Sequence, residues 1–370
     1  MIPKIPIIYY HSIAPLYPDW NRNFLSIAPD LFEKQIVFLK KFYSFITIKE
    51  YYQARKTGKN NKRNPILLTI DDGFLDNWLY AFPILKKHEI PATIFISPEM
   101  VDKREIVRTI SSNVSDNFGY MSWDEMRIME SSGLVDFQSH TMSHTKYSCS
   151  DKLVSFHHPN ADCLYPVGNL FPDRKPYHIA DKDFEKLLPY GFPFFEEKSS
   201  VISRKIKINP EFIEECLKRF ENYDFHHYNY ALAFEHIMPI YKRYKDSDAL
   251  ITNCESEEEY KKRVFYEVVE SKRIIEAQLN KEVEFLCWPH GDNNDLSHEI
   301  AINNGYKATT IGKADIEDSV DRISQRFGIG KFWGSTYMGL AKAQFKIADF
   351  KGSQLGRTLK KVYRLLLKRT

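Results

Sequence analysis

Short apolar runs alternate with segments of helical periodicity over the first 145 residues. The runs that predict strands are residues 5–10, 44–48, 65–70, 92–96 and 135–138. The segments with apolar side chains at three- to four-residue spacing, which predict helices, are residues 29–43, 78–88 and 123–131. Such alternation predicts parallel strands joined by right-handed crossovers, and therefore an α/β fold.

The pattern breaks after residue 145 and resumes near residue 256. Residues 146–255 are rich in proline and aromatic side chains, with expected helices at 210–223 and 230–244. The α/β pattern then returns; its expected elements are a helix at 256–279, a strand at 283–288, a helix at 296–304 and a strand at 307–311. We therefore expect a discontinuous α/β domain (1–145 and 256–335), a helical, aromatic-rich insertion (146–255) and a C-terminal tail (336–370).

The aromatic side chains of the insertion allow two interpretations. Tyr223, Phe225, Tyr228 and Tyr230 lie close together in the sequence. They could line a sugar-binding groove, because aromatic faces stack on sugar rings. Alternatively, they form the hydrophobic core of an ordinary helical subdomain.

The composition is that of a globular protein. Of the 370 residues, 43% are hydrophobic and 27% are charged, and the net charge of +3 is too small to indicate a nucleic-acid partner. The N-terminus lacks the pattern of a secretory signal, and no apolar run approaches the roughly 18 residues of a membrane span. The five cysteines are never spaced as Cys-x-x-Cys, which argues against a thiolate zinc site. We therefore expect a cytoplasmic protein.

The C-terminal tail is basic. Residues 351–369 contain seven Lys and Arg and no Asp or Glu, with leucines near helical spacing. This pattern predicts a helix that either lies on an anionic membrane surface or packs on the α/β domain. The first alternative would place the protein peripherally at the inner face of the membrane.

Two pairs of polar residues that follow predicted strands could carry chemistry. Asp71 and Asp72 end the strand at 65–70, and adjacent ionised carboxylates are costly unless a cation or a proton relieves them. His140 and His144 follow the strand at 135–138 and can converge on one cation. Each pair alone could equally be a solvated turn. Together, one carboxylate and two imidazoles make a metal-ligand set with open coordination positions.

These motifs resemble those of the polysaccharide deacetylases, the NodB-homology or carbohydrate esterase 4 family. The segment 68–74, Leu-Thr-Ile-Asp-Asp-Gly-Phe, is similar to the family's Thr-Phe-Asp-Asp-Gly motif. The segment 138–144, Gln-Ser-His-Thr-Met-Ser-His, is similar to its Ser-His-Thr-x-x-His motif. Residues 285–291 and 6–13 resemble the Tyr-Pro-Tyr-Gly segment and the N-terminal Tyr-His element of one branch.

The resemblance implies a distorted (β/α) barrel and a role for each residue. Asp72, His140 and His144 would hold one divalent metal, for which we expect zinc, with cobalt, nickel or manganese as alternatives. Asp71 would be the general base toward water, and His11 the acid that protonates the leaving group.

Two segments depart from the family motifs. His290 replaces the second aromatic residue of Tyr-Pro-Tyr-Gly, so it could be a further acid or a substrate contact, while its backbone N–H stabilises the oxyanion. The segment 174–177, Arg-Lys-Pro-Tyr, matches the Arg-x-Pro-Tyr motif of the wider family. We expect it not to be the true counterpart, because no strand precedes it.

The sequence thus predicts a hydrolase of amide bonds that removes an acetyl group, N-acetyl above all, from a sugar, a glycan or a lipid-linked sugar. Two other hypotheses remain: a catalytically inactive glycan-binding module, and a hydrolase of a non-sugar C–N bond.

Overall fold

A computed structural model describes residues 3–16, 25–159, 161–225, 227, 229–313, 319–328, 347–348 and 350–351. The predicted C-terminal helix lies outside this part of the chain except for Lys351, and Tyr228 lies outside it too. No helix of the described residues is long and apolar enough to cross a membrane.

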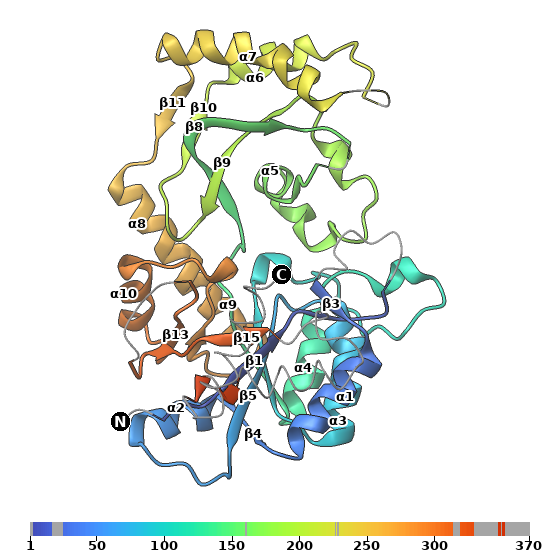
Figure 1. Ribbon diagram of the computed structural model, residues 1–370, viewed down its shortest axis with the longest axis vertical. Coiled ribbons are helices and arrows are strands. Elements are labelled where there is room, and N and C mark those ends of the chain that lie inside the picture. Colours follow the sequence, from blue (N-terminus) through green and yellow to red (C-terminus); the bar gives the residue numbers. More distant parts are fainter. Residues whose placement is uncertain are drawn as a thin grey trace, which may run out of the picture.

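The molecule has two parts along its long axis, a barrel at one end and the insertion at the other (Figure 1). Nine described strands form one sheet, in the order β14-β13-β12-β7-β6-β5-β1-β15 with β4 beside β5, and their pairings are parallel. These strands are β1 (Ile7–Tyr10), β4 (Ser44–Ile46), β5 (Pro65–Asp71), β6 (Ala92–Ile96), β7 (Val135–Ser139), β12 (Phe285–Leu286), β13 (Ala308–Thr310), β14 (Arg322–Ile323) and β15 (Arg326–Gly328). The sheet curls, and with its helices it is the distorted (β/α) barrel that the sequence predicts.

Alternation along the strands divides the core into two layers. Odd-numbered side chains of the first and central strands, such as Ile7, Leu67 and Phe95, belong to the inner cluster. Their neighbours Ile8 and Leu68 belong to the outer cluster, which packs under the helices. Because both faces are covered, the strands are apolar almost throughout, as is typical of parallel sheets.

Helices cover the outside of the sheet, with α1, α3 and α4 side by side in Figure 1. The longer helices of the barrel are α1 (Pro29–Lys40), α2 (Ile48–Thr57), α3 (Phe82–His88), α4 (Trp123–Ser131), α8 (Glu257–Phe265), α9 (Ser271–Leu279) and α10 (Asp295–Asn303). The shorter elements are β2 (Ser12–Ile13), β3 (Ser26–Ile27), η2 (Asn77–Ala81), η3 (Pro98–Met100), η4 (Val114–Asn117), η7 (Tyr266–Glu270) and η8 (Pro289–Gly291). The N-terminus of α2 is fixed by a capping box between Thr47 and Glu50.

The insertion contains both expected helices and, in addition, antiparallel strands that the sequence reading did not anticipate. Its elements are β8 (Lys146–Phe156), α5 (Leu164–Leu170), η5 (Pro172–Tyr177), η6 (Phe184–Leu187), β9 (Pro193–Ser199), β10 (Ile206–Ile208), α6 (Pro210–Arg219), α7 (Tyr230–Asp246) and β11 (Ile251–Cys254). β8 pairs with β9, and β10 pairs with β11. Phe225 is buried in the insertion's own core and Tyr223 packs against that core, which favours the core interpretation of these two aromatic residues.

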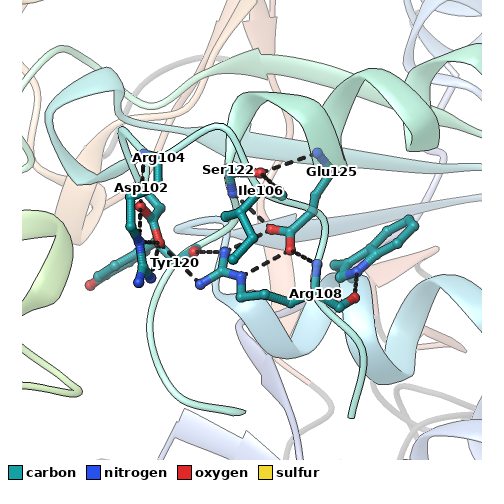
Figure 2. Close-up of polar contacts among 8 residues, drawn as sticks. Asp102, Arg104, Ile106, Arg108, Tyr120, Ser122 and Glu125 are labelled. Carbon is teal, nitrogen blue, oxygen red and sulfur yellow. Dashed lines mark hydrogen bonds and ion pairs between the residues drawn. The ribbon is translucent and has the colours of Figure 1, made fainter. Parts of the chain in front are cut away.

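A buried ionic network fixes the loop between β6 and α4 (Figure 2). The guanidinium of Arg108 donates to both carboxylate oxygens of Glu125, at 2.9 and 2.7 Å, and to Asp102 Oδ2 at 3.1 Å. It also donates to the carbonyl of Tyr120 at 2.7 Å. Since unpaired charges are costly to bury, this network has to form as a unit. It holds Met100 and Tyr120 where they line the cavity described next.

Candidate metal and catalytic site

The site lies in a cavity of about 460 Å³ at the carboxyl ends of the barrel strands. β5 ends at Asp71, β7 ends one residue before His140, and β12 ends shortly before His290. Parallel strands bring their carboxyl ends to one edge of a sheet, which is why α/β barrels carry their sites there. All six residues selected from the sequence line this cavity; they are His11, Asp71, Asp72, His140, His144 and His290.

Three of these side chains converge on one point. His140 Nε2 lies 3.4 Å and His144 Nε2 lies 3.3 Å from Asp72 Oδ1. The three potential ligand atoms all lie within 4.8 Å of one another. Asp72 and His144 reach this arrangement through left-handed backbone conformations, with φ of 75° and 47°. Such φ values are uncommon for residues other than glycine and are typical of functional turns.

The polar atoms of this cluster fit a divalent cation. Asp72 Oδ1 is buried and accepts no hydrogen bond within the described part of the chain, although two imidazole nitrogens flank it. His140 Nδ1 lies 2.7 Å from the carbonyl of Cys287, so it carries the proton and leaves Nε2 free as a ligand. Burial raises the pKa of Asp72, but the adjacent imidazoles of His140 and His144 outweigh it and hold that pKa well below its ordinary value.

The loop that carries the two imidazoles is anchored from two sides. Glu267 of η7 accepts the backbone N–H of Ser143 at 3.0 Å and also the Ser143 hydroxyl. Lys175 of the insertion donates to the Ser143 carbonyl at 3.4 Å and to Glu99 Oε2 at 2.6 Å. Both Glu267 and Lys175 are buried. The spacing between His140 and His144 is therefore set by groups outside the motif.

Asp71 points into the barrel and pairs with Arg326. Because side chains alternate along β5, Asp71 points to the same inner side of the sheet as Leu67 and Thr69. Arg326 on β15 pairs in register with Ile7, whose side chain also points inward. Two parallel hydrogen bonds of 2.7 and 2.8 Å join the guanidinium to both Asp71 oxygens. Burial raises the pKa of Asp71, but Arg326 outweighs it and holds the pKa below its ordinary value.

His11 faces the same carboxylate from β1. Its Nε2 lies 3.9 Å from Asp71 Oδ2, and 27% of its side chain is exposed. Asn77 Nδ2 donates to the His11 carbonyl at 2.9 Å and to Asp76 Oδ1 at 2.8 Å. The buried Asp76 also accepts from the Ser12 hydroxyl at 2.6 Å, so the first turn after β5 fixes the segment that carries His11.

His290 lies against the metal cluster without belonging to it. Its ring meets that of His144 edge-on, with centroids 4.7 Å apart, and its Nε2 lies 3.1 Å from Tyr165 Oη. Burial, with smaller contributions from neighbouring cations, lowers the pKa of His290 to about 2, so the imidazole is neutral. His290 has φ of 59°, and the turn around it is fixed by the close approach of Gly291 and Gly312.

A second group of possible ligands shares His140 with the first. Asp71, His140 and Cys287 also have ligand atoms within 4.8 Å of one another. Both Asp71 oxygens, however, are occupied by Arg326, which also donates to Cys287 Sγ at 2.9 Å. Burial raises the pKa of the Cys287 thiol well above its ordinary value, which keeps it protonated and a poor ligand. The cation therefore fits Asp72 and not Asp71.

The comparisons with known proteins agree with this geometry. Residues 58–160 match the family model of polysaccharide deacetylase, a range that includes Asp71, Asp72, His140 and His144. Over this range the chain is similar to the polysaccharide deacetylase family. The matched range ends within the insertion, so the remaining barrel strands carry parts of the site that the family model does not cover.

The relatives that match this chain have moderate sequence identity. It is 27% identical over 180 residues to the putative polysaccharide deacetylase YxkH of Bacillus subtilis (strain 168), a match covering 45% of this chain and 57% of the relative. It is 28% identical over 223 residues to the poly-β-1,6-N-acetyl-D-glucosamine N-deacetylase of Staphylococcus aureus (strain MRSA252), covering 54% of this chain and 73% of the relative.

A solved structure shares the fold over nearly the whole length. The de-N-acetylase from Aggregatibacter actinomycetemcomitans superposes with a TM-score of 0.54 at 17% identity. The superposition covers 92% of this chain and 98% of that one. At this identity the likeness concerns the fold.

Two residues of the site were missed by the sequence analysis. Arg326 lies on a three-residue strand that no hydrophobic run in the sequence predicts. Tyr165 lies within the insertion. The Arg-x-Pro-Tyr segment does not replace them, because Arg174 pairs with Asp181 and does not line the cavity. Arg326 could have been indicated only by predicting a strand at 326–328 beside β1 and applying the inward–outward alternation of the β1 side chains to it.

Proposed function

We propose that the protein is a metal-dependent hydrolase that removes the N-acetyl group from an amino sugar of a glycan. The observation that carries this proposal is the convergence of Asp72, His140 and His144 beside Asp71 in one cavity. A structural turn would not require two imidazoles and a carboxylate to meet around a buried oxygen that lacks a hydrogen bond.

Asp72, His140 and His144 would hold the cation, for which their nitrogen and oxygen donors favour zinc. A divalent cation bound there would lower the pKa of water and polarise the acetyl carbonyl. The three protein ligands leave further coordination positions for water and substrate. The protonated Nδ1 of His140, held by the Cys287 carbonyl, fixes the ring so that Nε2 faces the cation.

Asp71 is the proposed general base. Arg326 keeps its carboxylate ionised and fixes its plane, so that the base is ready to take a proton from the attacking water. Arg326 does not itself reach the acetyl group in this proposal. It is a positioning residue that acts through Asp71.

His11 is the proposed general acid. When water adds to the acetyl carbonyl and the C–N bond breaks, the departing nitrogen needs a proton, and His11 can supply it. Its position at 3.9 Å from Asp71 and its partial exposure support this role, because the imidazole can exchange protons with solvent. The products are acetate and a free amine.

His290 is proposed as a substrate contact. Its buried imidazole is neutral, so it has no extra proton to donate to a leaving group. The backbone N–H of its tight turn is the group that we propose for stabilising the oxyanion.

The proposed substrate is an N-acetylated hexosamine glycan. One relative is named as acting on poly-β-1,6-N-acetyl-D-glucosamine. The cavity supports a sugar ligand because its lining includes Tyr9, Tyr120 and Tyr165 together with charged groups.

The test measures acetate released from a panel of N- and O-acetylated saccharides, together with the metal content of the protein. We expect about one divalent ion per chain. Asp71→Asn should retain the ion and lose roughly 10²-fold or more in turnover, as for the loss of a general base. Asp72→Asn should lose both the ion and the activity.

Three outcomes would contradict the proposal. Full activity in Asp71→Asn would exclude the assigned base. Saccharide binding by the metal-loaded protein without release of acetate would instead support a glycan-binding module, and turnover of only non-sugar amides would support the third hypothesis.

A further inference from the structure

Helix α5 of the insertion is attached directly to the segment that carries the metal ligands. The hydroxyl of Thr145, the residue after His144, donates to Asn169 Oδ1 at 2.6 Å. Asn169 Nδ2 in turn donates to the carbonyl of Lys146 at 2.8 Å. Asn169 lies near the end of α5, so this reciprocal pair fixes the helix against the start of β8. Lys175, a few residues later, reaches Ser143 from the same side.

This attachment brings the first turn of α5 to the mouth of the cavity. Asp162, Leu164 and Tyr165 all line the cavity opposite the barrel strands. The ring of Tyr165 meets that of His290 edge-on, at 89° and 5.7 Å between centroids. Lys146, the first residue of β8, places its Nζ 5.3 Å from the centroid of the Tyr165 ring. An unbroken series of contacts thus runs from Tyr165 through His290 to His144.

We infer that the insertion forms part of the active site, with Tyr165 as its key residue: Tyr165 positions His290 and provides the wall for a second sugar ring of the substrate. The inference rests on the proposed function and names a part of the site that the family motifs do not contain. It makes the preferred ligand an oligosaccharide rather than a single sugar.

The chemistry of the three residues fits a pyranose chain. The Tyr165 ring offers apolar surface to the C–H face of a sugar, and it packs against the buried cluster that contains Leu164. The Asp162 carboxylate can accept hydrogen bonds from sugar hydroxyls at the rim of the cavity. Its Oδ1 already accepts a hydrogen bond from the Leu164 N–H at 3.1 Å. Tyr165 Oη and His290 Nε2 satisfy each other, so the imidazole is held in one orientation.

Two variants separate the two roles of Tyr165. Tyr165→Phe keeps the ring and removes the hydroxyl, so we expect kcat to fall about fivefold for every substrate, as for the loss of one hydrogen bond. Tyr165→Ala also removes the ring, so we expect KM for N-acetylglucosamine trimers and pentamers to rise about tenfold. KM for the N-acetylglucosamine monomer should change much less.

A matched control is available in the same subdomain. Tyr241 also belongs to the insertion, and its hydroxyl donates to the Asp151 carbonyl at 3.1 Å, but it does not line the cavity. Tyr241→Phe and Tyr241→Ala should leave kcat and both KM values unchanged. If Tyr165→Ala changes trimer and monomer KM equally, or if the Tyr165 variants behave like the Tyr241 variants, the inference is wrong.

A binding measurement separates this inference from the proposed function. Isothermal titration of the metal-free protein with fully deacetylated β-1,6-glucosamine pentamer needs no catalysis. We expect binding in the wild type that Tyr165→Ala weakens about tenfold. If the wild type binds in this way but releases no acetate, the proposed function fails while the inference stands. If the wild type binds no pentamer, the inference fails.

Discussion

Asp71 and Asp72 are neighbours in the sequence, but the backbone directs them to different partners. Strand alternation turns Asp71 into the barrel, where Arg326 holds it ionised. The left-handed conformation of Asp72 turns its carboxylate toward His140 and His144. The proposal can therefore give two identical side chains the roles of base and metal ligand, because an arginine pairs with one and the proposed cation would neutralise the other.

Asp76 is a buried acid just outside the metal cluster, and it makes stability depend on pH. Burial raises its pKa from 3.8 to about 6, despite hydrogen bonds from Ser12, Ile13 and Asn77. Between these values the folded state binds more protons than the unfolded state, so the free energy of unfolding falls as pH rises. A shift of this size lowers the free energy of unfolding by about 3 kcal/mol between pH 4 and pH 6. Above pH 6 this contribution no longer changes with pH.

Asp76→Asn should remove this pH dependence. Because an amide does not ionise, the stability of the variant relative to wild type should increase from pH 4 to pH 6 and then level off. Urea unfolding with a chelator present, so that metal binding does not contribute, measures the difference at each pH. The exposed Asp30→Asn serves as control, and a pH-independent difference between Asp76→Asn and wild type would refute the assignment.

At the scale of elements, the loop between β7 and β8 depends on the π turn η7. Glu267 accepts both the N–H and the hydroxyl of Ser143, which lies between the two metal-binding imidazoles. Glu267 is fully enclosed, and burial raises its pKa. A π turn widens the helix locally and is frequent at functional sites, which suits a helix that must project one carboxylate toward the loop.

Glu267→Ala should therefore weaken metal binding although Glu267 is not a ligand. We expect the affinity for zinc to fall by about 10- to 100-fold, as for other groups that orient ligands. Competition with a chromophoric chelator measures this without any assay of activity. Glu270→Ala is the matched control, since Glu270 ends the same turn but pairs with Arg273 at the surface. Equal zinc affinity in both variants would contradict the role.

The sequence predicted the long elements of the barrel better than the short ones. The central strands and most of the outer helices are confirmed within a few residues, because each buries a long apolar run or face, but the sequence analysis did not predict helix α2. β14 and β15 were missed, since strands of two or three residues leave no periodicity. β8 was missed because its eleven residues are mostly polar and half-buried, so they lack the apolar alternation of an ordinary strand.

The whole molecule has separate hydrophobic cores, one set in the barrel and others in the insertion. The main insertion core includes Phe156 and Phe220, whose rings stack with centroids 5.2 Å apart, and it shares no residue with the barrel clusters. A substitution in this core should therefore destabilise the insertion locally.

Phe220→Ala should destabilise the insertion by about 3–5 kcal/mol, the usual cost of removing a buried aromatic ring. Hydrogen exchange should rise in β8, β9 and α6 while zinc affinity stays within about twofold of wild type. Phe137→Ala, in the outer barrel core, is the comparison and should weaken both protection of the barrel and zinc binding. Loss of zinc binding in Phe220→Ala would show that the two cores unfold together.

The sequence by itself determined the parallel fold and the residues of the cation cluster, because the motifs directly follow strands whose apolar runs are readable locally. Only the tertiary structure decided what surrounds them. Arg326 meets Asp71 across 255 residues, and Tyr165 meets His290 across 125. Such contacts depend on how the sheet curls and where the insertion is attached. A local pattern of polar and apolar side chains predicts neither of these two features.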